Sequence, residues 1–294
     1  MTPLRHLQPY LGGHVSAAGG LALAIDRAEE IGADAIQIFG ASPRQWQARM
    51  PTKEEIAVYR ARLEKSRVKK VFLHAAYLVN LASPDVETRK KSIKNLAAHL
   101  KIADLIGADG LIFHVGSGKE LPKAEATGHV AVAIHEIFAA VPGHTPLLME
   151  NAAGGGQKIG AVPEDFAAIL KKVPSPRLRI CFDTAHAFEA GIIERYEPAD
   201  IKKLLDAWDA AVGLERINAL HINDSKTAYN SHHDRHENLG EGFIGIDGFK
   251  NLAKEKRLAH TTWLLEVPGF ANEGPDKKNM DILRSCFTPS HRAS

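Results

Sequence analysis

Residues 86–114 read VETRKKSIKNLAAHLKIADLIGADGLIFH and contain, in one stretch, the unit that decides the fold. The first part carries apolar residues three and four positions apart, which is typical of a helix with one buried face. A glycine then ends the helix, and the apolar run Gly110–His114 predicts a β-strand. The tetrapeptide IGAD forms this turn at Ile106–Asp109 and occurs again at Ile31–Asp34, before another apolar run. We interpret the recurrence as shared turn chemistry and not as a sequence repeat.

Strand-like and helix-like segments alternate along the rest of the chain. The eight expected strands are Leu11–Val15, Ala35–Phe39, Val71–His74, Gly110–His114, Pro146–Glu150, Leu178–Asp183, Ile217–Ile222 and Thr262–Val267. The expected helices include residues 21–33, 86–108, 129–141, 163–173 and 198–213. This alternation predicts an α/β fold of the (β/α)8 type, a TIM barrel with its site at the carboxyl ends of the strands. We expect one domain over residues 1–294, with a core at about residues 11–285 and a short tail at each end.

An open, doubly wound sheet is the main alternative fold. A glycine-rich phosphate loop would favour it, but the segment NAAGGGQKIG at residues 151–160 fits neither GxGxxG after a first strand nor GxxxxGK[ST]. We expect its glycines to shape a loop at the rim of the barrel.

Composition excludes several classes of protein. The 294 residues are 45% hydrophobic and 24% charged, as in soluble proteins with a sizeable core. The N-terminal stretch lacks the apolar core of a secretory signal, and no apolar run approaches the roughly 20 residues that span a bilayer. We therefore expect a cytoplasmic location without membrane contact. The two cysteines do not form a disulfide scaffold, and a net charge of +2 leaves any DNA affinity to locally placed Lys and Arg.

Six apolar runs end in a side chain that can bind a metal ion. The parallel strands of a barrel finish at one rim, so these side chains are expected to converge there. The six residues are His74, His114, Glu150, Asp183, His221 and Glu266. Two further clusters lie in DTAHAF, which contains His186, and in SHHDRHENLGEG, which contains Asp234 and His236.

Each candidate has a simpler explanation when it is taken alone. A single His at a strand end is commonly a hydrogen-bonded core residue, and Asp183 could cap the helix that follows it. Four carboxylates converging in one place are different, because their burial is costly without divalent cations. Imidazole and carboxylate without thiolate suit Zn²⁺ first and Mn²⁺ next. At about three protein ligands per catalytic zinc, nine ligands suit three ions and leave a positively charged pocket that attracts an anion.

Nine motifs together resemble the endonuclease IV family of apurinic/apyrimidinic endonucleases, which act in base excision repair. They are HVSAAGG (14–20), SPRQW (42–46), HAAYLVNLASPD (74–85), HVGSG (114–118), MENAAGGGQKIG (149–160), CFDTAHAFEAG (181–191), LHINDSK (220–226), DRHENLGEGFIG (234–245) and EVPGF (266–270). The resemblance runs from about Leu11 to Leu283. It implies a TIM barrel with three zinc ions that hydrolyses duplex DNA on the 5′ side of abasic sites. The products would be a 3′-hydroxyl and a 5′-deoxyribose phosphate, and blocking groups would be removed from 3′ ends.

The resemblance also implies a role for each candidate ligand. His74 and His114 would hold the first zinc, and Glu150 would bridge it to the second. Asp183, His221 and Glu266 would complete the second site, and His186, Asp234 and His236 would hold the third. The implied nucleophile is a hydroxide that bridges the first two ions. Glu150 and Glu266 would act as catalytic residues, with Glu266 orienting this hydroxide, and Mn²⁺ could replace Zn²⁺ at one or more positions.

Four other residues are expected to contact the DNA where the base is missing. By resemblance, Arg44 and Gln45 would insert from one loop, and Tyr77 and Leu78 from the next. The alternative is that Tyr77 and Leu78 only pack the start of a helix. The family usually carries Asn at the position of Ser42, so one DNA contact could be rerouted here. The segment HINDSK is expected to add polar contacts to the DNA.

Two other functions remain open at this stage. Sugar isomerases and epimerases of related barrels also gather a Glu, an Asp, a His and a Glu at strand ends, but they have no evident use for the five additional ligands. A non-catalytic DNA-binding protein with structural zinc would usually present thiolates. The expected partner is thus double-stranded DNA with abasic sites or blocked 3′ ends, bound by a monomer associated with the nucleoid.

Overall fold

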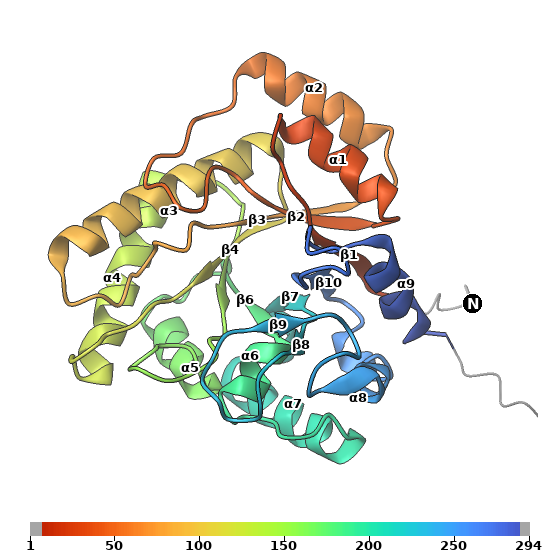
Figure 1. Ribbon diagram of the computed structural model, residues 1–294. Helices are drawn as coiled ribbons and strands as arrows, with labels where there is room; N and C mark the ends of the chain where they lie inside the picture. The colour runs from red at the N-terminus through yellow and green to blue at the C-terminus, as the bar shows by residue number, and fades with distance from the viewer. Residues whose placement is uncertain (1–7, 289–294) are drawn as a thin grey trace, which may run out of the picture.

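A computed structural model describes residues 8–288, and its centre is a closed barrel of eight parallel strands (Figure 1). The barrel strands are β1 (Tyr10–His14), β2 (Ala35–Phe39), β3 (Lys70–His74), β4 (Gly110–His114), β5 (Leu147–Glu150), β6 (Leu178–Asp183), β7 (Ile217–His221) and β10 (Thr262–Leu265). β10 pairs with both β1 and β7, which closes the barrel. The predicted TIM barrel is confirmed, and each expected strand lies within two residues of its predicted place. Most of the two predicted tails, residues 1–7 and 289–294, lies outside the described residues.

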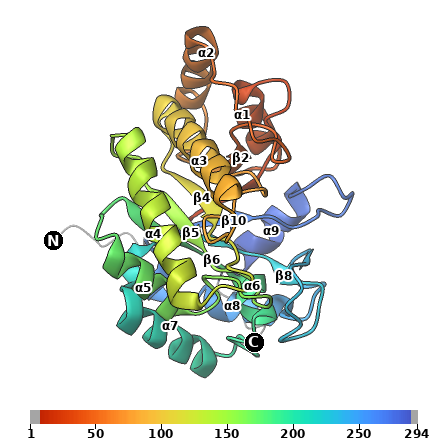
Figure 2. The same ribbon diagram turned by 90° about the vertical axis from the view of Figure 1, so that its left-hand side faces the viewer.

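Helices surround the barrel on its outside, and α3 and α4 run next to one another on the side that faces the viewer in Figure 2. The helices are α1 (Leu21–Glu30), α2 (Lys53–Glu64), α3 (Val86–Ile106), α4 (Lys123–Ala140), α5 (Pro163–Lys172), α6 (Thr184–Glu189), α7 (Pro198–Val212), α8 (Gly245–Leu252) and α9 (Lys277–Ser285). Two short 3-10 helices, η1 (Leu214–Arg216) and η2 (Lys256–Leu258), precede β7 and β10. In the part of the chain from residue 8 to residue 288, no helix has the length and apolar character needed to cross a bilayer.

The apolar periodicity missed α2 for a physical reason. Tyr59 is its one fully buried side chain, so the helix lacks a continuous apolar face. A different local signal starts the helix. Thr52 accepts a hydrogen bond from the backbone N–H of Glu55, and the carboxylate of Glu55 accepts one from the N–H of Thr52. This reciprocal cap satisfies two backbone donors that have no partner within the helix.

Both IGAD segments form the turn that their sequence predicts. Gly32 and Gly107 adopt left-handed φ angles of +75° and +74°, which glycine does without steric cost. After the second turn, Asp109 accepts hydrogen bonds from the Val71 backbone and from the Lys70 side chain of β3. The aspartate thus ties the start of one barrel strand to the next.

The interior of the barrel contains one apolar layer. Seven strands each contribute one side chain to a separate buried cluster: Ala35, Phe72, Ile112, Leu148, Cys181, Ala219 and Leu264. The eighth strand contributes Gly12, because a Cβ atom there would lie 1.7 Å from the carbonyl oxygen of Ala35. Side chains alternate along a strand, so the residue two positions after each layer member faces the same interior, nearer the carboxyl rim.

A small antiparallel pair lies above this rim, formed by β8 (Asp224–Ser225) and β9 (His236–Glu237). The buried carboxylate of Asp224 accepts hydrogen bonds from the backbone N–H groups of Gly240, Gly242 and Ile244. It therefore fixes the segment that follows β9. The long loop between the two short strands carries Asp234.

Candidate metal centre

A polar layer follows the apolar layer at the carboxyl rim of the barrel. Its eight members each come two residues after a member of the apolar layer or after Gly12: His14, Gln37, His74, His114, Glu150, Asp183, His221 and Glu266. The structure thus brings the six predicted strand-end side chains to one place. His14 and Gln37 were not predicted, because Gln37 lies inside the run AIQIF and His14 inside the expected strand Leu11–Val15. Counting two residues onward from Ala35 would have found Gln37.

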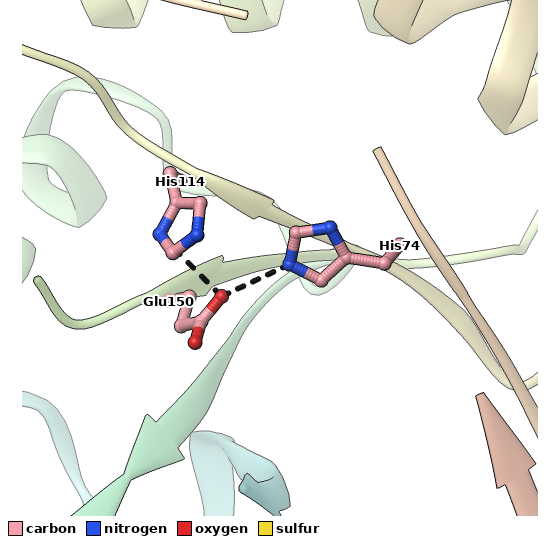
Figure 3. Close-up of side chains that lie close together, drawn as sticks. All are labelled: His74, His114 and Glu150. Atoms are coloured by element: carbon pink, nitrogen blue, oxygen red, sulfur yellow. Dashed lines mark hydrogen bonds and ion pairs between the residues drawn. The ribbon is translucent and has the colours of Figure 1, made fainter. Parts of the chain in front are cut away.

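The first group of possible ligands comprises His74, His114 and Glu150, which extend from the neighbouring strands β3, β4 and β5 (Figure 3). Oε2 of Glu150 lies 3.1 Å from Nε2 of His74 and 3.5 Å from Nδ1 of His114. Nδ1 of His74 donates a hydrogen bond to the carbonyl of Ala75 over 2.8 Å. That bond orients the ring with Nε2 toward the carboxylate.

The second group comprises Glu150, Asp183, His221 and Glu266. Nδ1 of His221 lies 2.8 Å from Oε1 of Glu150 and 3.2 Å from Oε2 of Glu266. Asp183 is farther away, with its Oδ2 3.8 Å from the same nitrogen. Glu150 therefore directs one oxygen to each group, Oε2 to the first and Oε1 to the second. This arrangement is the one that a bridging carboxylate requires.

The third group comprises His186 of α6, Asp234 of the loop between β8 and β9, and His236 of β9, all outside the barrel strands. Oδ1 of Asp234 lies 3.2 Å from Nε2 of His186 and 3.6 Å from Nε2 of His236. Nδ1 of each ring faces a backbone carbonyl, that of Asn151 for His186 and that of Glu266 for His236. Within residues 8–288, both Nε2 atoms are buried and, apart from these ion-pair contacts with carboxylates, have no hydrogen-bond partner. Asp183 also caps α6, since its Oδ1 accepts from the N–H of His186 over 2.8 Å.

The spacing of these donors fits divalent metal ions. With Zn–N bonds of about 2.0–2.1 Å, tetrahedral geometry separates neighbouring donor atoms by about 3.3 Å. The nitrogen–oxygen separations in the first and third groups are 3.1, 3.5, 3.2 and 3.6 Å. Two buried imidazole nitrogens without a hydrogen-bond partner among the described residues are also what metal ligands present when the ion is absent.

Charges at the centre are strongly coupled. Burial alone would raise the pKa of Glu150, but His114 and His221 outweigh it and hold that pKa well below its usual range. Burial works to lower the pKa of His186, yet Asp183 and Asp234 raise it well above the usual value for histidine. The carboxylates of the centre thus attract positive charge, which favours the binding of divalent cations.

Gln37 fixes the orientation of two members of the second group. Its Oε1 accepts a hydrogen bond from Nε2 of His221 over 2.8 Å, and its Nε2 donates to Oε1 of Glu266 over 2.5 Å. The same Nε2 lies 2.9 Å from Nδ1 of His14. The carboxylate of Glu266 accepts and Nε2 of His221 donates, so one orientation of the Gln37 amide serves both partners. Gln37 is fully buried and presents His221 with its Nδ1 toward Glu150.

The segment HINDSK, which was expected to contact DNA, is largely buried. Asn223, Asp224 and Ser225 are completely buried, so Lys226 is the exposed residue of this segment that is available for such contacts. Asn223 donates to Oδ2 of Asp183 over 2.7 Å and accepts from the backbone N–H of Glu266 over 2.7 Å. These residues point inward because they replace solvent around buried carboxylates.

The two predicted DNA-contacting pairs lie in adjacent loops. Arg44 and Gln45 are exposed after β2, and Tyr77 and Leu78 are 63% and 38% exposed after β3. The backbone N–H of Tyr77 donates to the carbonyl of Pro43 over 3.1 Å, which joins the loops. The exposure of Tyr77 and Leu78 argues against the alternative that they only pack the start of a helix.

The glycine-rich segment after β5 forms a loop at this rim, as expected. Gly154 and Gly155 have φ angles of +79° and +76°. A Cβ atom on Gly154 would lie 2.7 Å from Nδ1 of His232, in the loop that carries Asp234. Glycine thus permits close packing between the two loops.

Known proteins resemble this chain over nearly its whole length. Residues 25–286 match the family model described as xylose isomerase-like TIM barrel. A protein named probable endonuclease 4 from Halothermothrix orenii is 36% identical over 275 residues, which cover 93% of this chain and 99% of that protein. A protein of the same name from Aquifex aeolicus is 35% identical, with 94% and 97% of the two chains covered.

Solved structures of related proteins also resemble this chain. The crystal structure of endonuclease IV from Thermus thermophilus has a TM-score of 0.83 and 36% sequence identity, covering 95% of this chain and 98% of that one. A D-tagatose 3-epimerase-like protein has a TM-score of 0.67 at 20% identity, covering 94% and 96% of the two chains, and shares the fold alone. By sequence and by structure, the chain belongs to the endonuclease IV family, within the xylose isomerase-like TIM barrels.

Proposed function

We propose that this protein is a DNA-repair hydrolase that cuts the phosphodiester bond 5′ to abasic sites in duplex DNA. The products would carry a 3′-hydroxyl and a 5′-deoxyribose phosphate, and the same centre would remove blocking groups from 3′ ends. Relatives named endonuclease 4 support a nuclease activity. The single observation that carries the proposal is the third group, His186, Asp234 and His236, beside the two strand-borne groups.

We further propose three divalent ions per chain, Zn²⁺ with Mn²⁺ as an alternative at one or more positions. When bound, such ions lower the pKa of a coordinated water and stabilise the negative charge that develops on the leaving 3′-oxygen. His74, His114 and Oε2 of Glu150 would hold the first ion. Oε1 of Glu150 would hold the second ion together with Asp183, His221 and Glu266. The third ion would be held by the third group, His186, Asp234 and His236, called the loop-borne group below.

Glu266 is the residue best placed to act on the attacking water. Its side chain is 18% exposed, whereas that of Glu150 is fully buried. Gln37 holds Oε1 of Glu266, and Oε2 faces His221. We propose that this carboxylate orients the attacking water and accepts its hydrogen bond, while Glu150 keeps the first two positions at a constant separation.

Recognition of the damage is assigned to the two adjacent loops. An abasic site lacks one stacked base, so inserting side chains and extruding the sugar costs less there than at an intact nucleotide. Arg44 and Gln45 would enter from one side, and Tyr77 and Leu78 would fill the gap. Ser42 is also exposed on the first loop. Its side chain is shorter than that of the Asn usual in the family, so neighbouring residues of the loop would have to make one contact with the DNA in its place.

Sugar isomerisation is the competing activity, because sugar-epimerase barrels share this fold. The second group alone would serve that chemistry. Sugar isomerisation would leave the third group without a purpose, since one or two ions suffice for that reaction.

We also propose that the protein acts as a monomer, in one domain spanning the chain, in the cytoplasm and on nucleoid DNA.

The experiment is incision of a labelled duplex that contains one abasic analogue. We expect a single cut 5′ to the analogue and a 3′ end that a polymerase extends. Glu266→Gln should abolish incision while most DNA binding remains. The matched control is Glu237→Gln, a neighbouring rim carboxylate that pairs with Lys226. A fully metallated preparation that leaves this duplex intact and isomerises a ketose would contradict the proposal.

A further inference from the structure

A buried carboxylate lies beside the third group and has no part in the function proposed so far. Glu189 is the last residue of α6, three positions after His186, and is 0% exposed. It lies in the motif CFDTAHAFEAG but not at a strand end, so the pattern of strand-end ligands did not reveal it. Its environment shows what its two oxygens can bind.

One oxygen of Glu189 anchors the loop that carries Asp234. Oε1 accepts hydrogen bonds from the Ser225 hydroxyl over 2.8 Å and from the Arg235 backbone N–H over 3.2 Å. The Thr227 hydroxyl adds a third bond over 3.3 Å. These contacts join the end of α6 to both ends of the loop between β8 and β9.

The other oxygen is unsatisfied. Within residues 8–288, Oε2 of Glu189 is buried and has no hydrogen-bond partner. Burying a carboxylate oxygen without a hydrogen-bond donor is unfavourable. Such an atom in a native structure indicates a missing ligand, commonly an ion or a water molecule.

The position of Glu189 indicates an ion. One of its oxygens lies within 4.8 Å of possible ligand atoms on both His186 and Asp234. Nε2 of His186, one helical turn away, is also buried and has no hydrogen-bond partner among the described residues. A nitrogen that is paired with Asp234 alone and a carboxylate oxygen that has no donor thus come from successive turns of one short helix.

We propose that Glu189 supplies an additional carboxylate oxygen to the third metal position, beside His186, Asp234 and His236. This inference rests on the three-metal centre proposed above. The third position then has two imidazole and two carboxylate ligands. Five carboxylates instead of four surround three divalent ions, so the net charge of the centre falls from +2 to +1. Oxygen donors suit Mn²⁺ better than an imidazole-rich set does, so this fourth ligand should raise the affinity of the third position for Mn²⁺.

Substitution by glutamine separates this role from a purely structural one. Glu189→Gln keeps one oxygen to accept the bonds from Ser225, Thr227 and Arg235, and replaces the other oxygen by an NH₂ group that cannot bind a metal. A residue that only anchors the loop would tolerate this change. A metal ligand would not. Glu189→Ala removes both roles and reports on the anchor.

The test measures metal content and affinity on the full-length protein. Bound metal ions are first removed with a chelator, and each protein is then titrated with Mn²⁺ or Zn²⁺. The proteins compared are wild-type, Glu189→Gln, Glu189→Ala and the control Glu237→Gln. Bound ions are counted by mass spectrometry, and free Mn²⁺ is measured by electron paramagnetic resonance. Melting temperatures of the metal-free forms check folding. Incision of abasic duplex is followed in parallel.

We expect three ions in wild-type and in Glu237→Gln. In Glu189→Gln, the affinity for one Mn²⁺ should fall by about 10- to 100-fold, with an unchanged melting temperature of the metal-free form. Three ions bound to Glu189→Gln with wild-type affinity would overturn the inference and leave the three-metal proposal intact, as would a loss confined to Glu189→Ala. A wild-type chain that binds only two ions would overturn both.

Discussion

The strand-borne groups and the loop-borne group contain similar ligands but are held in different ways. His74, Glu150 and His221 lie at the ends of paired barrel strands, and their side chains are at most 3% exposed. Asp234 lies on a loop and is 48% exposed, and His236 belongs to a strand of two residues. The barrel strands thus fix the first two groups, whereas the third group also depends on the loop between β8 and β9.

Removing the bridge between the strand-borne groups should have the largest effect. Glu150→Gln takes away the carboxylate that faces both groups, and with it several kcal/mol of transition-state stabilisation. We expect incision to fall by about a thousandfold or more and fewer than two ions to remain bound. Single-turnover incision and metal analysis test this. Near-normal turnover by a fully metallated variant would show that Glu150 is not a bridge.

Disrupting the loop-borne group should have a smaller and more selective effect. Asp234→Asn should lower incision by about a hundredfold while two ions stay bound. When wild-type protein is treated with a chelator, the ion at the loop-borne group should leave first, because Asp234 is half-exposed. His233→Ala, at an exposed residue of the same loop, is the control. Loss of all three ions together in Asp234→Asn would mean that the groups are not separable.

Gln37 tests whether the barrel interior positions the second group. Gln37→Leu leaves His221 and Glu266 without their shared partner, and we expect incision and the affinity for one metal ion to fall by about 10- to 100-fold. Gln47→Leu, at an exposed glutamine on the loop after β2, should change neither quantity. If Gln37→Leu lowered only thermal stability, Gln37 would be a packing residue.

Recognition by the loops should depend on Arg44 more than on neighbouring cations. Arg44→Ala should reduce the preference for abasic over intact duplex by about tenfold, because the lost contact is one made where the base is missing. Binding titrations with both duplexes measure this preference. Arg49→Ala provides the control, because Arg49 lies on the same loop and pairs with Glu55 of α2. Equal losses on both duplexes would make Arg44 an ordinary phosphate contact.

The smallest predicted effect is on the pH dependence of stability without metal. The pKa values of Glu150 and Glu266 lie below the usual 4.5, so their contribution is present above that pH and lost on acidification. Those of His186 and His221 lie above 6.5, so theirs is present below 6.5 and lost as pH rises. The contribution of these four groups should therefore be greatest between about pH 4.5 and 6.5, although His14 and His114, whose pKa values are lowered by burial, oppose it below pH 6.5. Urea unfolding across pH tests this, and a maximum above pH 8 would contradict it.

Much of the fold could be predicted from sequence because most barrel strands are short, largely apolar runs between turn signals. The same property allowed the six strand-end residues to be identified, since a charged or imidazole side chain directly after an apolar run is easily recognised. Gln37 escaped because an uncharged residue inside a run has no local signature. Glu189 escaped because its neighbours Ser225 and Arg235 are distant in sequence. Asn223 resembled a surface residue until the fold placed it beneath Asp183.

The central claim is that two strand-borne groups and one loop-borne group form a single three-metal centre that cuts abasic DNA. The most direct measurement is metal stoichiometry on the same preparation that is assayed for incision. We expect close to three ions per chain and a cut 5′ to the abasic site, and in Asp234→Asn we expect the third ion to be lost and incision to fall by about a hundredfold. Full incision by a chain that holds two ions, or three ions without any incision, would contradict it.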